Sequence, residues 1–187
     1  LNVYNPKTNT FTYYSDNGSL SDDAILCAYK DNDGDLWFGT YTGGLNRYMP
    51  QTNTFKWYKH DENDPNSIGG NDVRTIIQDK SGKIWIGTNQ GGLNVLDKKT
   101  GKFTQYNYDN SNLKGNDIRS LFIDSKNRLW VGTFEDGLFL FENGDFKQFN
   151  IENDIRKENS IFSIDEDSDG NLWLGTYRTG LVKFDPD

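Results

Sequence analysis

Seven residues of this 187-residue chain have side chains suited to holding a polar, ring-shaped ligand. They are Tyr41, Arg74, Asn89, Arg119, Phe134, Tyr177 and Arg178. Flat aromatic rings can cover the apolar face of a sugar, and the planar polar groups of Arg and Asn can meet its hydroxyl groups. The same aromatic rings could instead fill gaps in the packing, and the residue types alone leave both interpretations open.

Residues typical of catalysis are few. His60 is the only histidine, and it stands in a polar stretch beside Asp61 and Glu62, where a histidine is usually solvated. The sequence contains no Ser-His-Asp set and no phosphate-binding glycine loop. We therefore expect a protein that is not an enzyme and that uses no cofactor. A lyase or hydrolase that uses His60 is the least favoured alternative.

One acidic segment, from Asp165 to Gly170, matches the first half of an EF-hand calcium loop. The twelfth position of such a loop needs a bidentate Glu, but here it is Thr176. Strand-like sequence flanks the segment, whereas an EF-hand has helices there. The sequence therefore predicts a hairpin turn at this place and no metal site.

The charge of the chain is acidic, with a formal net value of -8. Nucleic-acid and membrane surfaces require clustered basic residues, but the lysines and arginines are scattered along the sequence. We therefore expect neither partner. The only cysteine, Cys27, lies in a strand-like run and is expected to pack as a small apolar residue. The chain begins at Leu1 without a signal-peptide pattern, so we interpret it as a piece of a longer protein.

A short phrase recurs four times and organises the elements that would position the candidate residues. It consists of Leu or Ile, then Trp, an apolar residue, Gly and Thr, with a Gly-Leu pair at a fixed distance after the Thr. The copies are Leu36–Thr40, Ile84–Thr88, Leu129–Thr133 and Leu172–Thr176. The tryptophans are 48, 45 and 43 residues apart. A period of this length is typical of repeat architectures.

Each repeat predicts four short antiparallel strands, A to D, joined by tight turns. In the second copy, strand B has two apolar faces, because Ile84 and Ile86 point one way and Trp85 the other. Each sheet must therefore be covered on both faces, and the next repeat is the obvious cover. Sheets stacked in this way form a β-propeller. The sequence thus predicts an all-β propeller with four-stranded antiparallel blades.

The repeats also predict how the chain is divided. Residues 1–187 form a single repeat domain that consists of strands C and D, three full blades and then strands A, B and C. The N-terminal strand D could complete the last blade and close a ring, but the N-terminal strand C would then be surplus. This surplus favours a fragment of a longer array, or pairing with another chain.

The strand order places the candidate residues on one face, where strand A starts, B ends, C starts and D ends. The turns between strands B and C carry Tyr41, Asn89, Phe134, Tyr177 and Arg178, and the first part of strand A carries Arg74 and Arg119. Loops that a rigid scaffold holds in place often carry function.

The best copy of the repeat runs from Asp31 to Tyr58. It contains Asp-x-x-Gly-x-Leu-Trp-Phe-Gly-Thr and then Gly-Gly-Leu-x-x-Tyr-x-Pro-x-Thr-x-x-Phe-x-x-Tyr. This pattern resembles the two-component regulator propeller repeat, and the match covers nearly the whole chain. In that family, such repeats build the sensor region ahead of a transmembrane helix and a histidine kinase. Many members belong to hybrid two-component systems of polysaccharide-degrading bacteria, where the sensor faces the periplasm and detects glycan fragments.

The resemblance implies a non-enzymatic, periplasmic, ligand-sensing fragment that recognises an oligosaccharide and acts on a kinase outside this chain. A ligand can do this only through different affinities for two arrangements of the repeats. A second hypothesis, from another class, is a scaffold for protein–protein assembly that associates with itself or with further blades.

Overall fold

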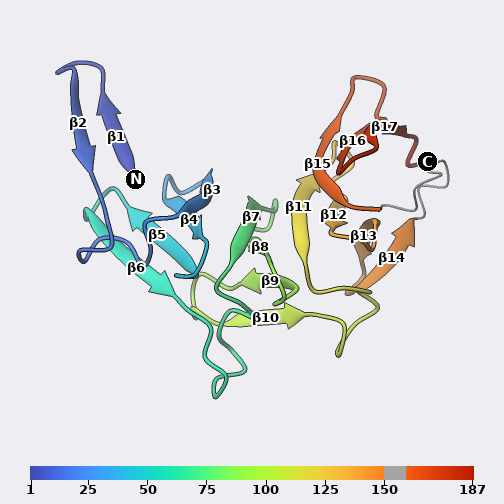
Figure 1. Ribbon diagram of the computed structural model, residues 1–187, viewed down its shortest axis with the longest axis horizontal. Helices are drawn as coiled ribbons and strands as arrows, with labels where there is room; N and C mark the ends of the chain where they lie inside the picture. Colours follow the sequence, from blue (N-terminus) through green and yellow to red (C-terminus); the bar gives the residue numbers. More distant parts are fainter. Residues whose placement is uncertain (150–158) are drawn as a thin grey trace.

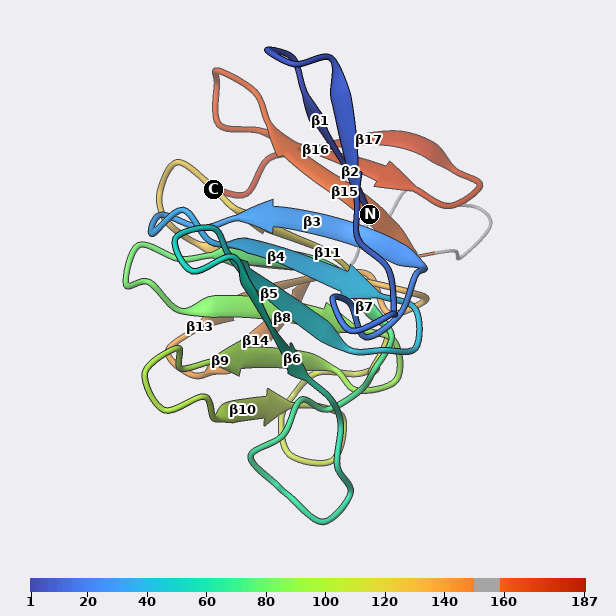
Figure 2. The same cartoon turned by 90° about the vertical axis from the view of Figure 1, so that its left-hand side faces the viewer.

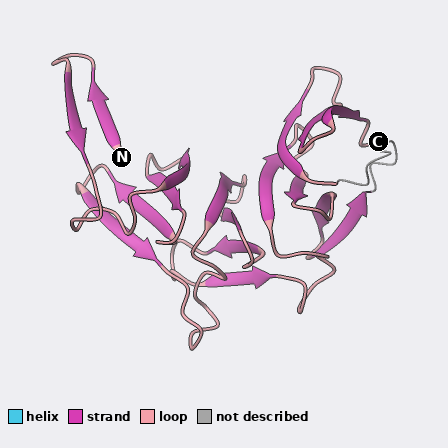
Figure 3. Ribbon diagram, in the orientation of Figure 1, coloured by secondary structure: helices cyan, strands magenta, loops and turns pink. Residues whose placement is uncertain are grey.

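The computed structural model describes residues 1–149 and 159–187, and every regular element in these residues is a β-strand (Figures 1 and 3). The strands form antiparallel sheets in chain order. The first sheet is a hairpin of β1 (Asn2–Asn5) and β2 (Thr10–Tyr13). The predicted all-β fold with antiparallel blades is therefore confirmed.

Four sheets follow the hairpin, and we call them blades 1 to 4. Blade 1 contains β3 (Ile25–Lys30), β4 (Leu36–Thr40), β5 (Leu45–Met49) and β6 (Thr54–Tyr58). Blade 2 contains β7 (Val73–Gln78), β8 (Ile84–Thr88), β9 (Leu93–Leu96) and β10 (Phe103–Tyr106). Blade 3 contains β11 (Ile118–Ile123), β12 (Leu129–Thr133), β13 (Leu138–Glu142) and β14 (Asp145–Phe149). Blade 4 contains β15 (Ile161–Glu166), β16 (Leu172–Thr176) and β17 (Gly180–Phe184).

The blades stand around a common centre, with β3, β7, β11 and β15 on the inside (Figure 1). Each of these inner strands contacts the next one along the chain. Figure 2 shows β3, β4, β5 and β6 side by side in that order. The result is an open propeller arc. Strand β2 pairs with β1, and their hairpin lies at the opposite end of the arc from β17, so the N-terminal strand D does not close a ring in this structure.

The tryptophans of the repeated phrase pack between blades. Trp37 and Trp130 are fully buried, and Trp85 is 5% exposed. Trp37 of blade 1 shares a core cluster with Val73 of blade 2, so the indole ring belongs to an interface between sheets. Burial of Trp37, Trp85 and Trp130 is what the two apolar faces of these strands led us to expect. Trp173 in blade 4 is only half-buried.

An Asp six residues before each tryptophan holds the indole N–H. The hydrogen bonds join Trp37 Nε1 to Asp31 Oδ2 (2.9 Å), Trp85 Nε1 to Asp79 Oδ2 (2.8 Å), Trp130 Nε1 to Asp124 Oδ2 (2.8 Å) and Trp173 Nε1 to Asp167 Oδ2 (2.9 Å). The same carboxylate accepts backbone N–H groups of the turn, as in the 3.0 Å bond from Asp35 N to Asp31 Oδ1. One Asp therefore fixes the hairpin turn and the indole ring together, which accounts for its place in every repeat.

The Gly-Thr pair of each phrase has two separate roles. The Thr hydroxyl donates to the carbonyl of the Gly four residues later, as in the 2.8 Å bond from Thr40 Oγ1 to Gly44 O. The preceding glycine leaves room for the next blade: a Cβ atom on Gly87 would lie 2.6 Å from Ile118 Cγ2 on β11. These roles explain why the repeat keeps Gly and Thr at these positions.

Candidate functional site

Every inner strand carries a β-bulge next to its first residue. The register shifts lie between Ile25 and Cys27, Val73 and Thr75, Ile118 and Ser120, and Ile161 and Ser163. The residues inside the shifts are Leu26, Arg74, Arg119 and Phe162. A bulge leaves one residue outside the ladder and re-aims its side chain. The four inner strands therefore present four side chains near their first residues, on the same face of the propeller arc.

In each blade, a turn connects the second and third strands. A backbone hydrogen bond holds the first residue of this turn next to the start of the inner strand. The bonds run from Tyr41 N to Ala24 O (3.0 Å), Asn89 N to Asp72 O (2.8 Å), Phe134 N to Asp117 O (2.9 Å) and Tyr177 N to Ser160 O (3.1 Å). Bulge residues and turn residues thus form one continuous row. We call this row the rim, and it comprises Leu26, Tyr41, Asp72, Arg74, Asn89, Asp117, Arg119, Phe134, Phe162, Tyr177 and Arg178.

Blades 2 and 3 give the rim a charged centre. Arg74 Nη2 donates to Asp72 Oδ2 at 2.6 Å, and Asn89 Nδ2 donates to the same oxygen at 3.0 Å. In blade 3, Arg119 Nη2 donates to Asp117 Oδ2 at 2.6 Å. The two Asp-x-Arg pairs are partly buried, and each carboxylate engages its guanidinium through one oxygen only.

Four buried polar atoms of these pairs lack partners in the described part of the chain. Within the described part of the chain, no hydrogen bond reaches Oδ1 of Asp72 or Asp117, or Nε of Arg74 or Arg119, and all four atoms are buried. A buried polar atom without a partner costs roughly 1–3 kcal/mol, so such atoms call for an explanation. The same two kinds of atom are left without partners in both neighbouring blades.

The electrostatics of Asp117 follow from this setting. Burial raises the pKa of the Asp117 carboxyl above its usual range, and the nearby charge of Asp72 adds to the rise. The guanidinium groups of Arg119 and Arg74 oppose it. The charges of blades 2 and 3 are thus coupled across the blade boundary.

Blades 3 and 4 give the rim an aromatic end. The rings of Phe162 and Tyr177 stack with their centroids 5.6 Å apart and their planes at 27°. Phe134 approaches both rings, at 6.3 and 6.4 Å. The Arg119 guanidinium lies 5.1 Å from the centre of Phe134 and 5.5 Å from that of Phe162, so it joins the charged centre to the aromatic end. Phe162 and Tyr177 each remain 44% exposed.

The structure places all seven predicted residues in this row. Arg119, Phe134 and Tyr177 belong to the group around Phe162, and Arg178 lies over the ring of Tyr177 at 4.9 Å. The remaining three, Tyr41, Arg74 and Asn89, form a second group, in which Arg74 lies 5.7 Å from the centre of the Tyr41 ring.

Sequence reasoning missed Phe162 as a candidate. Its signal was present, because aligning the repeats on the second residue of strand A places Phe162 level with Arg74 and Arg119. The bulge that makes this position special cannot be seen in the sequence.

His60 has a structural role in the loop before blade 2. Its backbone N–H donates to Asn71 Oδ1 at 2.8 Å, and its ring Nδ1 lies 2.8 Å from the carbonyl oxygen of Ile68. Both contacts fasten the loop to residues just ahead of β7. These contacts account for His60 as a residue that stabilises the loop.

The remaining motifs have structural explanations too. The acidic segment forms the hairpin turn between β15 and β16, in which Asp167 holds the ring of Trp173, so the predicted turn is confirmed. No group of three His, Cys, Asp or Glu residues is placed to hold a metal ion in residues 1–149 and 159–187. Burial raises the pKa of the Cys27 thiol to about 12, so the thiolate is scarce at neutral pH.

The fold and the repeated Asp–Trp framework define a β-propeller segment with a rim of variable residues. The sequence profile of the family described as "Two component regulator propeller" matches residues 19–42, 67–90, 112–135 and 156–178, about half of the chain. The chain belongs to this family, and the resemblance found in the sequence is confirmed.

Solved structures with the same fold include the extracellular domains of hybrid two component systems. One such domain from B. thetaiotaomicron is 27% identical, with a TM-score of 0.81, over 96% of this chain and 25% of that one. A second domain from the same organism is 25% identical, with a TM-score of 0.76, over 97% of this chain and 24% of that one. The present chain therefore spans about a quarter of these extracellular domains.

A more distant likeness concerns an enzyme. Virginiamycin B lyase from Staphylococcus aureus is 19% identical, with a TM-score of 0.73, over 100% of this chain and 63% of the lyase. At this identity the likeness shows the shared fold alone. No curated protein matches the sequence. Among the residues that the structure describes, no helix is long and apolar enough to cross a membrane.

Proposed function

We propose that this chain is part of the extracellular, ligand-sensing region of a two-component sensor, that it lies in the periplasm, and that it binds an oligosaccharide at the rim without chemical turnover. The observation that carries the proposal is the bulge shared by all four inner strands. It presents Arg74, Arg119 and Phe162 at one end of the inner strands. Phe162 stacks there on the turn residue Tyr177, beside two Asp-x-Arg pairs that have unpartnered polar atoms.

The chemistry of the rim suits a sugar better than a purely apolar ligand. The exposed rings of Phe162 and Tyr177 can cover the C–H face of a pyranose. Oδ1 of Asp117 can accept a hydrogen bond from a hydroxyl group, and Nε of Arg119 can donate one, after a small shift that opens these buried atoms. A ring and its hydroxyl groups would then be recognised by adjacent parts of one surface.

The position of the rim also suits a sensor. Its residues come from four blades, and Arg119 of blade 3 already contacts Phe162 of blade 4. A ligand that binds across such boundaries favours one arrangement of the blades over another, and its differential affinity is the free energy available for signalling. The kinase that would respond lies outside this chain.

A glycan array followed by calorimetry tests the proposal. An oligosaccharide that binds the unmodified chain should bind Phe162→Ala and Tyr177→Ala about five- to tenfold more weakly, because each loses about 1 kcal/mol of ring contact. Tyr13→Ala, which alters an exposed tyrosine of the β1–β2 hairpin, is the matched control and should keep the affinity. A screen without any glycan ligand, or equal losses in the rim and control variants, would reject carbohydrate recognition at the rim.

A second candidate function, assembly with another copy or with further blades, is favoured by the hairpin. Tyr4, Phe11 and Tyr13 are all at least half exposed there, and β17 has no neighbour on its outer side among the described strands. Exposed strand edges and aromatic side chains are a common basis for association. The solution mass at several concentrations tests this candidate. A mass that stays at one chain throughout would count against it, whereas sugar binding would be unaffected.

A further inference from the structure

A groove of about 970 Å³ lies at the opposite end of the strands from the rim. It is bounded by the β7–β8 turn and the β9–β10 turn of blade 2, and by Asn32 and Asp33 of the β3–β4 turn in blade 1. Ligand pockets commonly have volumes of about 300–1,000 Å³, so the groove is large enough for a small ligand. We call it the lysine groove, because Lys80, Lys83, Lys98, Lys99 and Lys102 line it.

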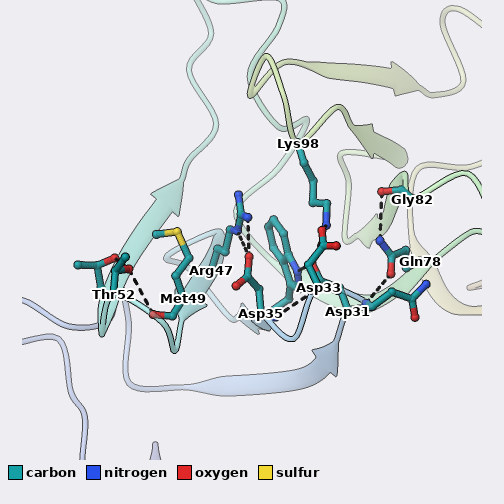
Figure 4. Close-up of polar contacts among 12 residues, drawn as sticks. Asp31, Asp33, Asp35, Arg47, Met49, Thr52, Gln78, Gly82 and Lys98 are labelled. Carbon is teal, nitrogen blue, oxygen red and sulfur yellow. Dashed lines mark hydrogen bonds and ion pairs between the residues drawn. The ribbon is translucent and has the colours of Figure 1, made fainter.

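Lys98 lines the lysine groove and connects the two blades that bound it. Its ammonium group hydrogen-bonds to Asp31 Oδ2 at 2.9 Å and to Asp33, and thereby ties blade 2 to blade 1 (Figure 4). A second tie runs between the same blades, because Gln78 Oε1 accepts a 2.8 Å hydrogen bond from Asn32 N. The shape of the groove is thus fixed by contacts between blades, and the charge of Lys98 is satisfied within the protein.

The other four lysines have no such partner. Lys80, Lys83, Lys99 and Lys102 are exposed, and in the described part of the chain no ion pair or hydrogen bond engages their ammonium groups. The second lining carboxylate, Asp97, accepts the backbone N–H of Lys99 instead, at 2.8 Å. The groove therefore holds an excess of positive charge in a chain whose net charge is -8.

Blades 1 and 4 show that the fold does not require these lysines, although blade 3 has a cation, Arg128, at the position of Lys83. The positions of Lys80 and Lys83 are occupied by Asn32 and Asp35 in blade 1, and by Ser168 and Asn171 in blade 4. All three turns keep the first Asp that holds the tryptophan. The lysines of blade 2 therefore stand at places where the hairpin accepts uncharged or acidic residues.

The neighbouring groove, between blades 2 and 3, supplies a contrast. It has a volume of about 500 Å³, and its own cations are Lys126 and Arg128, with Lys80 shared between the two grooves. Lys126 pairs with Asp187, and Arg128 pairs with Asp124 at 2.5 Å and with Asp187 at 3.2 Å. Cations at this second boundary are matched by carboxylates, whereas those of the lysine groove are not.

We propose that the lysine groove binds a small polyanion, a molecule that carries at least two sulfate, phosphate or carboxylate groups. Several ammonium groups around one groove attract such a ligand at long range and can each donate to one of its oxygens. The ammonium group of lysine is a point charge on a flexible side chain, whereas the guanidinium group of arginine has a fixed planar geometry. Lysines therefore suit an anion whose charged groups vary in spacing. The groove and the rim are separate sites at opposite ends of the inner strands.

Isothermal titration calorimetry at low ionic strength tests the proposal with four probes. Sucrose octasulfate, inositol hexakisphosphate and tri-galacturonic acid represent the three kinds of anion, and maltotriose is the neutral reference. At least one anion should bind the unmodified chain, with an affinity that falls as salt is added, and maltotriose should not bind the groove. The anion that binds most tightly identifies the preferred chemical group.

Two matched variants locate the site. Replacing Lys80, Lys83, Lys99 and Lys102 together by Gln should weaken anion binding at least tenfold. Replacing the exposed Lys7, Lys59, Lys114 and Lys147 by Gln removes the same charge elsewhere and should weaken it less than threefold. Equal losses in the two variants would show diffuse attraction only, and absence of binding by all three anions would also overturn the proposal. Thermal unfolding of both variants checks that the fold is retained, and rim binding of sugar is expected to persist in both.

Discussion

Each blade contains a framework, the Asp and Trp of its repeated phrase, and a part of the rim. The framework residues are the same in all four blades, whereas the rim residues differ from blade to blade. The framework keeps its chemistry in all four blades: an Asp oxygen lies 2.8 or 2.9 Å from each indole nitrogen. At the bulge, only a few residues away, the blades carry Leu26, Arg74, Arg119 and Phe162. Where stacking requires a particular side chain, its type is repeated. Where stacking does not require a particular side chain, as at the bulge, the residue type can differ between blades without loss of the fold.

The largest expected effect is at the centre of the framework. Trp37→Ala should lower the free energy of unfolding by about 3–5 kcal/mol, because it empties a fully buried space between blades 1 and 2. Urea denaturation followed by circular dichroism measures the loss. Trp57→Ala, which removes a 44% exposed indole from β6, is the comparison and should cost about 1 kcal/mol or less. Similar losses in the two variants would contradict the framework described here.

The next effect concerns the carboxylate that holds the indole. Asp31→Asn should cost about 2 kcal/mol at pH 7, because the buried side chain loses its charge-assisted bonds to Trp37 and Lys98. Burial opposes ionisation of Asp31, but these two partners outweigh it and lower its pKa. The contribution of Asp31 is therefore fully present above the ordinary carboxyl pKa of about 4 and is lost as the pH falls through the lower value of the folded state.

Denaturation of both proteins between pH 7 and pH 3 measures this contribution. The difference between the unmodified chain and Asp31→Asn should shrink below about pH 4. A difference that is constant over this range would show that the charge of Asp31 does not contribute.

An effect of similar size is expected where one blade approaches the next. Gly87→Ala should cost about 1–3 kcal/mol, because its Cβ would meet Ile118 Cγ2 at 2.6 Å and push β11 away. Gly175→Ala in blade 4 is the matched control. Its Cβ would meet the hydroxyl of Ser163 in the same blade, and that small side chain can rotate. Thermal melting of the two variants should therefore rank Gly87→Ala well below Gly175→Ala, and the reverse order would be incompatible with tight stacking at Gly87.

The smallest effect is expected at the rim, and it has the opposite dependence on pH. The raised pKa of Asp117 means that its folded form binds a proton more tightly than its unfolded form. The unmodified chain should therefore gain stability relative to Asp117→Asn as the pH falls from 7 to the ordinary carboxyl pKa of about 4, whereas Asp31 loses its contribution only below that range. Urea midpoints at both pH values measure the change. A relative loss of stability on acidification would show that Asp117 is stabilised as a carboxylate and belongs with the framework.

The sequence was a reliable guide wherever a feature repeats. The phrase around Trp37, Trp85, Trp130 and Trp173 predicted the strands, the stacking and the family, because each residue in it serves a contact inside one hairpin or between adjacent blades. It also predicted that Arg74, Arg119 and the turn aromatics share a face, since strand order alone determines that.

The sequence was a poor guide where residues distant in the chain meet. The lysines seemed scattered, yet Lys80 and Lys83 lie beside Lys98, Lys99 and Lys102, because two turns of one blade share an end of the sheet. Phe162 was overlooked because a register shift, which has no sequence signature of its own, brings it to the rim. The ring that strand β2 could have closed is open in the structure.

The sequence by itself determined the repeat, the antiparallel blade and the buried indole rings, because these depend on local alternation and on contacts within one period of the chain. Only the tertiary structure decided which charges are paired, which polar atoms are left without partners and where cations collect. Those properties depend on distances between turns and blades that the period does not specify. The two proposed recognition sites, the rim and the lysine groove, are therefore properties of the assembled surface and not of any single repeat.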